Sequence, residues 1–164
     1  MRALPRILLI GATALVLASP ISAQRADDQI NPRSVQLQRQ GEALIGTGKL
    51  EQAEDSLETA LAVDPRNRWA FVDLARLAEK QHLFGKAIRM TNKALLIEPN
   101  DLDAIAVQGE AMVEMGATAR AQANLQKLQG MCRQGCPQLA QLSSAISRGP
   151  TVAAAKAPDV PKKD

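Results

Sequence analysis

The stretch that decides the fold is WAFVDLARLAEKQHLFGKAIRMTNKALLIEPN, Trp69–Asn100. It holds two apolar runs at helical spacing, separated by a short break at 82–85. In each run small or apolar residues recur at i, i+4 and i+7 and share one helix face: Phe71, Ala75 and Ala78, then Ala87, Thr91 and Ala94. Because small residues let helix axes approach to the close end of the usual range of about 8–10 Å, the stretch predicts a tightly packed helical hairpin.

The same pattern recurs every 34 residues along the chain. When units 34–67, 68–101 and 102–135 are written beneath one another without gaps, small residues align in columns: Gly41, Ala75 and Gly109; Ala53, Ala87 and Ala121; Ala60 and Ala94. The turn sequences LAVDPRN and LLIEPND also align, through Pro65 and Pro99. Self-similarity at this period predicts a stacked array of hairpins. A generic helical bundle with an accidental repeat is the alternative.

This pattern resembles the tetratricopeptide repeat family, from Ser34 to about Leu128, and within it the small exported bacterial proteins. The resemblance implies an all-α fold, a short solenoid of three helix-turn-helix repeats followed by a C-terminal capping helix. Four positions depart from the family pattern: Gln40 and Gln108 stand where Leu is usual, Thr91 replaces a large apolar residue and Arg133 replaces Pro.

The composition favours helices and gives little support for a nucleic-acid ligand. The aromatic residues are Trp69, Phe71 and Phe84 alone, and a core of Ala and Leu suits packed helices better than sheets. The formal net charge is +3, and no run of basic residues occurs apart from Lys162-Lys163. Nucleic-acid binding needs a clustered basic face, so no nucleic-acid partner is expected.

The first 24 residues, MRALPRILLIGATALVLASPISAQ, have the three parts of a secretory signal peptide. We expect residues 1–23 to be removed by cleavage between Ala23 and Gln24. The apolar run is about a dozen residues, whereas a spanning helix needs about 20, so no membrane span is expected in the mature chain. The chain is therefore expected to be exported to the periplasm of a Gram-negative bacterium. Residues 24–33 form a polar lead-in, in which Asn31-Pro32 predicts a helix start.

The only two cysteines lie in GMCRQGCPQL, Gly130–Leu139, before a final amphipathic pattern at 137–148. A disulfide between Cys132 and Cys136 is the favoured interpretation, because an exported chain meets an oxidising compartment. A zinc site needs about four ligands, and the sole histidine is fifty residues away. A redox pair usually has the spacing C-x-x-C, whereas three residues separate these two cysteines. The zinc-site and redox interpretations both stay open. Residues 149–164 lack apolar periodicity and are expected to be a disordered tail.

No motif for catalysis is present, so the sequence predicts no catalytic residue, no cofactor and no metal site. The resemblance implies that the first helix of each repeat lines a concave groove, which would hold a segment of an unknown protein or peptide. The groove residues carried over by column are Val35, Gln38, Glu42, Ile45, Trp69, Val72, Arg76, Glu79, Asp103, Ala106, Glu110 and Val113.

Arg76 is the only cation in that groove set, which also holds four carboxylates. Some relatives grip a peptide's terminal carboxylate with several cations, so an apolar or cationic segment that docks on Trp69 and Val72 fits this chain better. Alternatively, Trp69 is half-buried against a neighbouring unit. The predicted function is a non-enzymatic adaptor or assembly factor. The alternatives are a thiol-redox or metal-handling protein that uses the cysteine pair, and a self-associating structural homo-oligomer.

Overall fold

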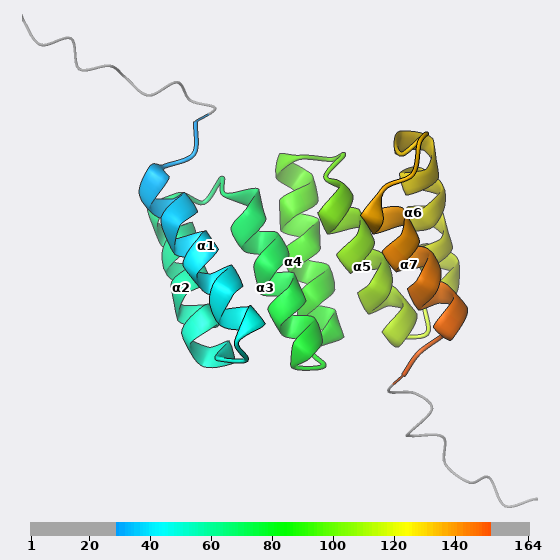
Figure 1. The fold of residues 1–164 in the computed structure, drawn as a ribbon, viewed down its shortest axis with the longest axis horizontal. Helices are drawn as coiled ribbons and strands as arrows, with labels where there is room; N and C mark the ends of the chain where they lie inside the picture. Colours follow the sequence, from blue (N-terminus) through cyan, green and yellow to red (C-terminus); the bar gives the residue numbers. More distant parts are fainter. Residues whose placement is uncertain (1–28, 152–164) are drawn as a thin grey trace, which may run out of the picture.

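The computed structural model describes residues 29–151, which form seven helices and contain no strand (Figure 1). The helices are α1 (Pro32–Gly46), α2 (Leu50–Val63), α3 (Arg68–Lys80), α4 (Phe84–Ile97), α5 (Leu102–Glu114), α6 (Thr118–Met131) and α7 (Pro137–Arg148). The first six pack as three consecutive hairpins, and α7 packs against α5 and α6. The prediction of an all-α solenoid with three repeats and a capping helix is confirmed.

Some expectations concern residues that the structure does not describe. The signal peptide at 1–23, its cleavage site and most of the lead-in lie outside the described residues, as does the tail from residue 152 onward. Within 29–151 no helix is both long and apolar enough to cross a membrane. The helix start predicted at Asn31-Pro32 is present: the Asn31 side chain accepts a hydrogen bond from the N–H of Arg33, and Pro32 opens α1.

Equivalent hydrogen bonds join the two helices of the first and third hairpins. Ser56 Oγ donates to the carbonyl of Leu37 at 2.9 Å. Two repeat periods later, Asn124 Nδ2 donates to the carbonyl of Ile105 at 3.0 Å. Both donors are 19 residues beyond their acceptors. The 34-residue period therefore repeats contacts as well as residue types.

The turn inside each hairpin needs one residue with left-handed backbone angles. Gly48, His82 and Gly116 occupy this position, one in each repeat, with φ of 74°, 57° and 74°. Glycine adopts such angles freely because it has no Cβ, whereas other L-residues rarely do. His82 therefore holds, in the middle repeat, the position that glycine occupies in the other two.

Small residues allow the helices to meet, as the columns predicted, but two of them face different neighbours. A Cβ on Gly41 would lie 2.5 Å from Leu57 Cγ, in the partner helix of the same hairpin. A Cβ on Gly109 would lie 2.6 Å from Leu142 Cδ1, in α7. Both leucines are fully buried. The glycine of the third repeat thus makes room for the capping helix.

Between repeats, buried polar side chains close the turns. Asn67 caps α3 by accepting a hydrogen bond from the N–H of Ala70 at 3.3 Å, and Asp101 caps α5 in the same way. Asn67 Nδ2 also donates to Ser34 Oγ at 2.8 Å, and that hydroxyl donates to the carbonyl of Ala60 at 2.7 Å. Asn67 and Ser34 are both fully buried. The chain of bonds holds α1, the end of α2 and the start of α3 together.

Replacing Asn67 with Ala is expected to lower the free energy of unfolding by about 2 kcal/mol, because it removes a helix cap and leaves the buried Ser34 hydroxyl without a donor. Urea denaturation followed by circular dichroism measures the change. Asn100→Ala, an exposed residue in the equivalent turn, is the control and should change stability by less than about 0.5 kcal/mol. Equal effects of the two substitutions would contradict a special role for the Asn67 network.

Candidate functional site: the concave groove

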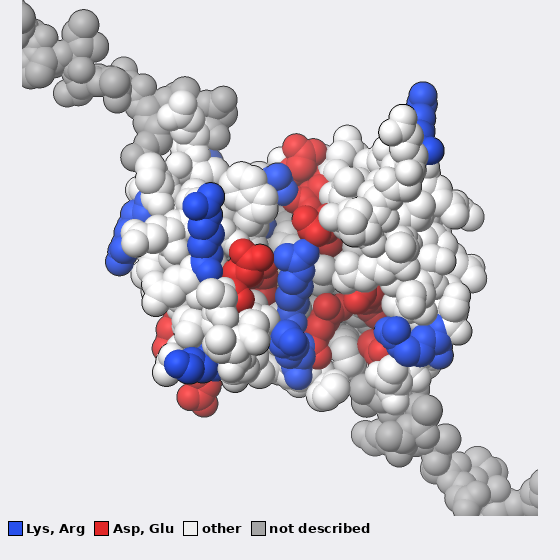
Figure 2. Space-filling model, viewed as in Figure 1, with Lys and Arg blue, Asp and Glu red and all other residues white. Residues whose placement is uncertain are grey.

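A pocket of about 290 Å³ opens on the concave face, between α1, α3 and the start of α5. Its lining consists of Val35, Gln38, Arg39, Glu42, Trp69, Val72, Asp73, Arg76 and Asp103. Figure 2 shows this face, where acidic and basic side chains lie side by side over α1, α3 and α5. The first helices of all three repeats contribute to the pocket.

Seven of the twelve groove residues expected from the sequence line this pocket: Val35, Gln38, Glu42, Trp69, Val72, Arg76 and Asp103. Glu79 and Glu110 are partly exposed and lie nearer the C-terminal ends of α3 and α5. Val72 lines the pocket but is only 2% exposed, so it offers a ligand little area.

The remaining three expected residues do not present groove surface. Ile45, Ala106 and Val113 are 8%, 1% and 1% exposed. Ala106 packs in a cluster with Leu142, and Val113 packs against Ile146. The capping helix therefore packs against these two residues of α5. Ile45 instead packs in the core of the first hairpin.

Asp73 and Arg39 line the pocket although the column comparison omitted them. Asp73 is only 2% exposed, and its carboxylate accepts hydrogen bonds from Gln38 Nε2 and from Arg76 Nη1, the latter at 3.1 Å. Burial raises the pKa of Asp73, which these bonds and the Arg76 charge oppose. The available signal was a carboxylate flanked by apolar residues, with an arginine three residues later, the spacing of a helical ion pair.

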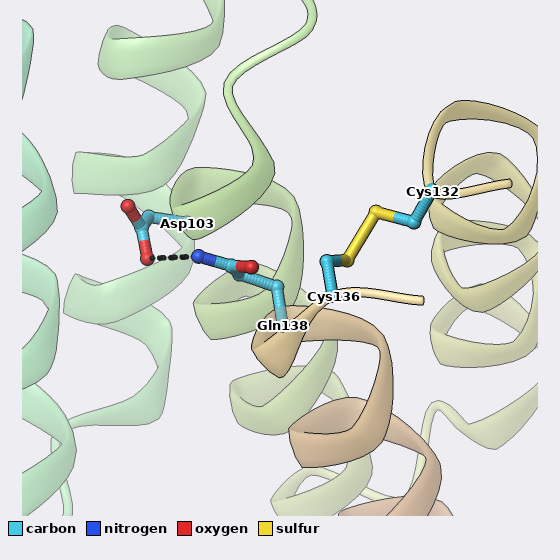
Figure 3. The surroundings of a disulfide bond; sticks show 4 residues. All are labelled: Asp103, Cys132, Cys136 and Gln138. Atoms are coloured by element: carbon cyan, nitrogen blue, oxygen red, sulfur yellow. Dashed lines mark hydrogen bonds between the residues drawn. A yellow bond between two sulfur atoms is a disulfide. The ribbon is translucent and has the colours of Figure 1, made fainter. Parts of the chain in front are cut away.

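The Arg76 guanidinium is already paired within the protein. Besides Asp73, it donates from Nη2 to Asp103 Oδ1 at 2.8 Å, which links α3 to α5. Gln138 of α7 donates to the same oxygen at 3.2 Å, as Figure 3 shows. Asp103 thus links α3, α5 and α7. Arg76, which is paired with two carboxylates, is poorly placed to bind an anionic ligand as well.

A second group of carboxylates lies further along the same face. Burial and the neighbouring Glu110 charge raise the pKa of Glu79 to about 8. Burial also raises the pKa of Glu110. One buried oxygen of Glu110 has no hydrogen-bond partner among the described residues. This part of the groove therefore disfavours additional negative charge and favours a cation.

Trp69 lies on the rim of the pocket with 41% of its surface exposed. The Arg68 guanidinium lies 4.4 Å from the centre of its ring system, a cation–π contact that helps to orient the side chain. Asp101, buried in the turn, pairs with the same Arg68. An exposed tryptophan held in this way offers a large, rigid apolar surface to a ligand.

The two cysteines lie away from the pocket, where α6 passes into α7. Their sulfurs point toward each other, and their Cα atoms are 5.7 Å apart, a separation that a disulfide can span (Figure 3). Within residues 29–151 no group of three His, Cys, Asp or Glu side chains is arranged to hold a metal ion. His82 lies exposed at its turn, with its ring edge-on to Phe84 at 5.9 Å.

Comparison with known proteins supports the repeat pattern. The tetratricopeptide repeat family model matches residues 44–109. A 72-residue segment is 39% identical to cellulose synthase 2 operon protein C of Komagataeibacter xylinus. That match covers 43% of this chain but only 5% of the relative, so the chain corresponds to a small part of that protein.

Two solved structures illustrate the likeness in fold. The Sgt2 tetratricopeptide domain of Aspergillus fumigatus aligns with a TM-score of 0.65 and 20% identity, over 82% of this chain and 89% of that one. The second tetratricopeptide domain of human RPAP3, in complex with the HSP70 peptide SGPTIEEVD, aligns with a TM-score of 0.62 and 18% identity, over 69% and 94%. Residues 44–109 thus match the tetratricopeptide repeat family model, and residues 29–151 have the fold of a tetratricopeptide repeat solenoid.

Proposed function

We propose that this protein is a non-enzymatic interaction module that binds an apolar or cationic segment of another protein in its concave groove, as an adaptor or assembly factor. The observation that carries the proposal is the pocket on this face, with the exposed Trp69 at its rim and carboxylates around it. An aromatic anchor beside carboxylates suits a segment with one apolar side chain next to a lysine or arginine.

The charge of the groove argues against an acidic ligand like the peptide in the human RPAP3 complex. That peptide, SGPTIEEVD, carries three carboxylate side chains. In this chain Glu42, Asp73 and Asp103 line the pocket, and Arg76 is already paired with two of them. An acidic segment would meet repulsion, and unpairing Arg76 would leave the buried Asp73 carboxylate uncompensated. The likeness in fold therefore does not extend to ligand charge.

Trp69→Ala is expected to reduce capture of the partner from a periplasmic extract by at least about tenfold, the loss typical of an interface anchor. The melting temperature should change by less than about 2 °C, because the ring is not part of the core. Leu96→Ala is the matched control: Leu96 is an apolar residue of α4 that is 84% exposed and does not line the pocket, so capture should be unchanged. A large fall in melting temperature with capture intact would mean that Trp69 has a structural role only.

We also propose that the protein works after export to the periplasm, with its signal peptide removed at Ala23, and with Cys132 and Cys136 joined as a disulfide. The N-terminal sequence pattern and the 5.7 Å separation of the two Cα atoms, which a disulfide can span, support this. The bond would fix the start of α7, from which Gln138 reaches the groove. It would act as a structural link and not as a redox centre.

The mature protein is expected to begin at Gln24 and to contain no free thiol. Intact-mass spectrometry of the non-reduced protein from the periplasm should show a mass two hydrogens below the fully reduced value, and no labelling by iodoacetamide. Reduction in denaturant should restore both thiols. This control distinguishes a disulfide from irreversible modification of the cysteines. Two freely alkylated thiols in the native protein would favour a thiol-redox or metal-handling role instead.

A further inference from the structure

After the capping helix ends, the described chain contacts the C-terminal end of α5. Gly149 terminates α7 with a φ of 74°. Two residues later, the N–H and the hydroxyl of Thr151 both donate to the Glu114 carboxylate, at 2.8 and 2.9 Å. Glu114 is the last residue of α5, one of the three helices that form the groove. Figure 1 shows this segment turning from α7 toward the end of α5.

The next thirteen residues, VAAAKAPDVPKKD at 152–164, have a composition that complements the groove. They carry three lysines, at positions 156, 162 and 163, and two aspartates, at positions 159 and 164, so their side chains have a net charge of +1. Pro158 and Pro161 are three residues apart, the spacing that places two prolines on one face of a polyproline II helix. Such segments dock against exposed aromatic side chains at low entropic cost, because proline already restricts the free chain.

The segment is long enough to cross the groove. Extended chain spans at most about 3.6 Å per residue, so Lys156 can lie up to about 18 Å from Thr151 and Lys162 up to about 40 Å. The groove is smaller than this: α5 rises about 16 Å from Asp103 to Glu114, and neighbouring helices are about 10 Å apart. Lys156 can therefore reach Glu79 and Glu110, and Lys162 can reach the pocket beside Trp69.

We propose that residues 152–164 bind in the groove of their own chain, with their lysines against its carboxylates and Pro158 and Pro161 against Trp69. The proposal rests on the proposed function, since it concerns the same groove. The segment then acts as an intramolecular competitor that an external partner must displace. Each contact is weak, but a short tether gives an effective concentration in the millimolar range, which is enough to occupy a weak site.

Carbodiimide crosslinking of the full mature chain tests the proposal directly, because the reagent joins a lysine amine to a carboxylate only where the two are in contact. Peptide mapping should find residues 156, 162 and 163 linked to Glu79, Glu110, Glu42 or Asp103. Equal mixtures of ¹⁴N and ¹⁵N protein distinguish links within one chain from links between copies. Links that are mainly between copies, or that spread evenly to exposed carboxylates of α2 such as Glu51 and Glu58, would overturn the proposal.

A double variant separates docking from simple tethering. Pro158→Gly with Pro161→Gly keeps every lysine and the length of the tether, yet removes the restricted backbone, so the yield of groove links should fall by at least about threefold. An unchanged yield would mean that proximity alone produces the links, and would overturn the proposal.

Trp69 is the only tryptophan and gives a second readout. Reversing the three tail lysines to Glu should raise acrylamide quenching of Trp69 by at least about 1.5-fold, as the segment leaves the pocket. Lys127→Glu, on the exposed surface of α6, should leave quenching unchanged. Equal quenching in all three proteins would count against the proposal. None of these measurements uses the external partner, so their failure would leave the result for capture through Trp69 intact.

Discussion

Leu142→Ala is expected to lower the free energy of unfolding by about 3–4 kcal/mol, within the usual range for a buried leucine. Leu142 is fully buried, and its side chain occupies the space above Gly109 that a Cβ at that position would fill. Truncation would open a cavity between α7 and α5 and loosen the element that covers the third hairpin. The melting temperature should fall by roughly 10–15 °C.

Thermal and urea denaturation measure this change, with Ser144→Ala as the control. Ser144 is exposed on the same helix, so its replacement should alter stability by less than about 0.5 kcal/mol. Hydrogen exchange adds a spatial test: in Leu142→Ala the amides of α5 and α7 should lose protection more than those of α1 and α2. A loss spread equally over all seven helices would mean that the array unfolds as one unit, without a locally closed end.

Glu79→Gln is expected to reduce the dependence of stability on pH. The pKa of Glu79 is about 8 in the folded protein, against an ordinary value of 4.5. Between these values the unfolded chain has lost its proton while the folded chain keeps it, so wild-type stability falls as pH rises from about 4.5 to 8. Glutamine has no proton to lose, so the variant escapes this penalty.

At pH 9 the Glu79→Gln protein should be more stable than wild type by about 1–2 kcal/mol, a figure well below the full shift because Glu79 is partly exposed. At pH 4.5 the two should be equally stable. Glu110 also has a raised pKa, so the stability of the variant should still fall somewhat as pH rises. Urea denaturation from pH 4.5 to 9 provides the comparison, and Glu58→Gln, exposed on α2, should match wild type throughout. Parallel curves for all three proteins would show that Glu79 is not buried enough to matter.

The helices could be predicted from the sequence because side-chain size recurs at a fixed interval. The 34-residue columns located the close contacts at Ala53 and Ala87, both fully buried in the structure. The columns could not reveal a difference in surroundings between equivalent positions. Ala106 and Val113 match positions in the earlier repeats, but α7 covers them, and no repeat pattern reports what a later helix will cover.

The electrostatics of the groove were only partly accessible from the sequence. The excess of carboxylates over cations was visible by counting. Two features were not accessible: Asp73 is buried, and it shares Arg76 with Asp103. Both depend on which side chains of α3 and α5 meet, and this is a tertiary property. The raised pKa of Glu79 is also a tertiary property, because it arises from burial and from the charge of Glu110, which lies in a different repeat.

The packing of α7 also bears on how such a protein could change in length. α3 packs against both helices of the hairpin before it, α5 does the same, and α7 repeats this arrangement against α5 and α6. The described residues therefore include the first helix of a fourth module, α7, which carries exposed serines. Lengthening by duplication would need only a second helix after α7, because the docking geometry for the next module already exists.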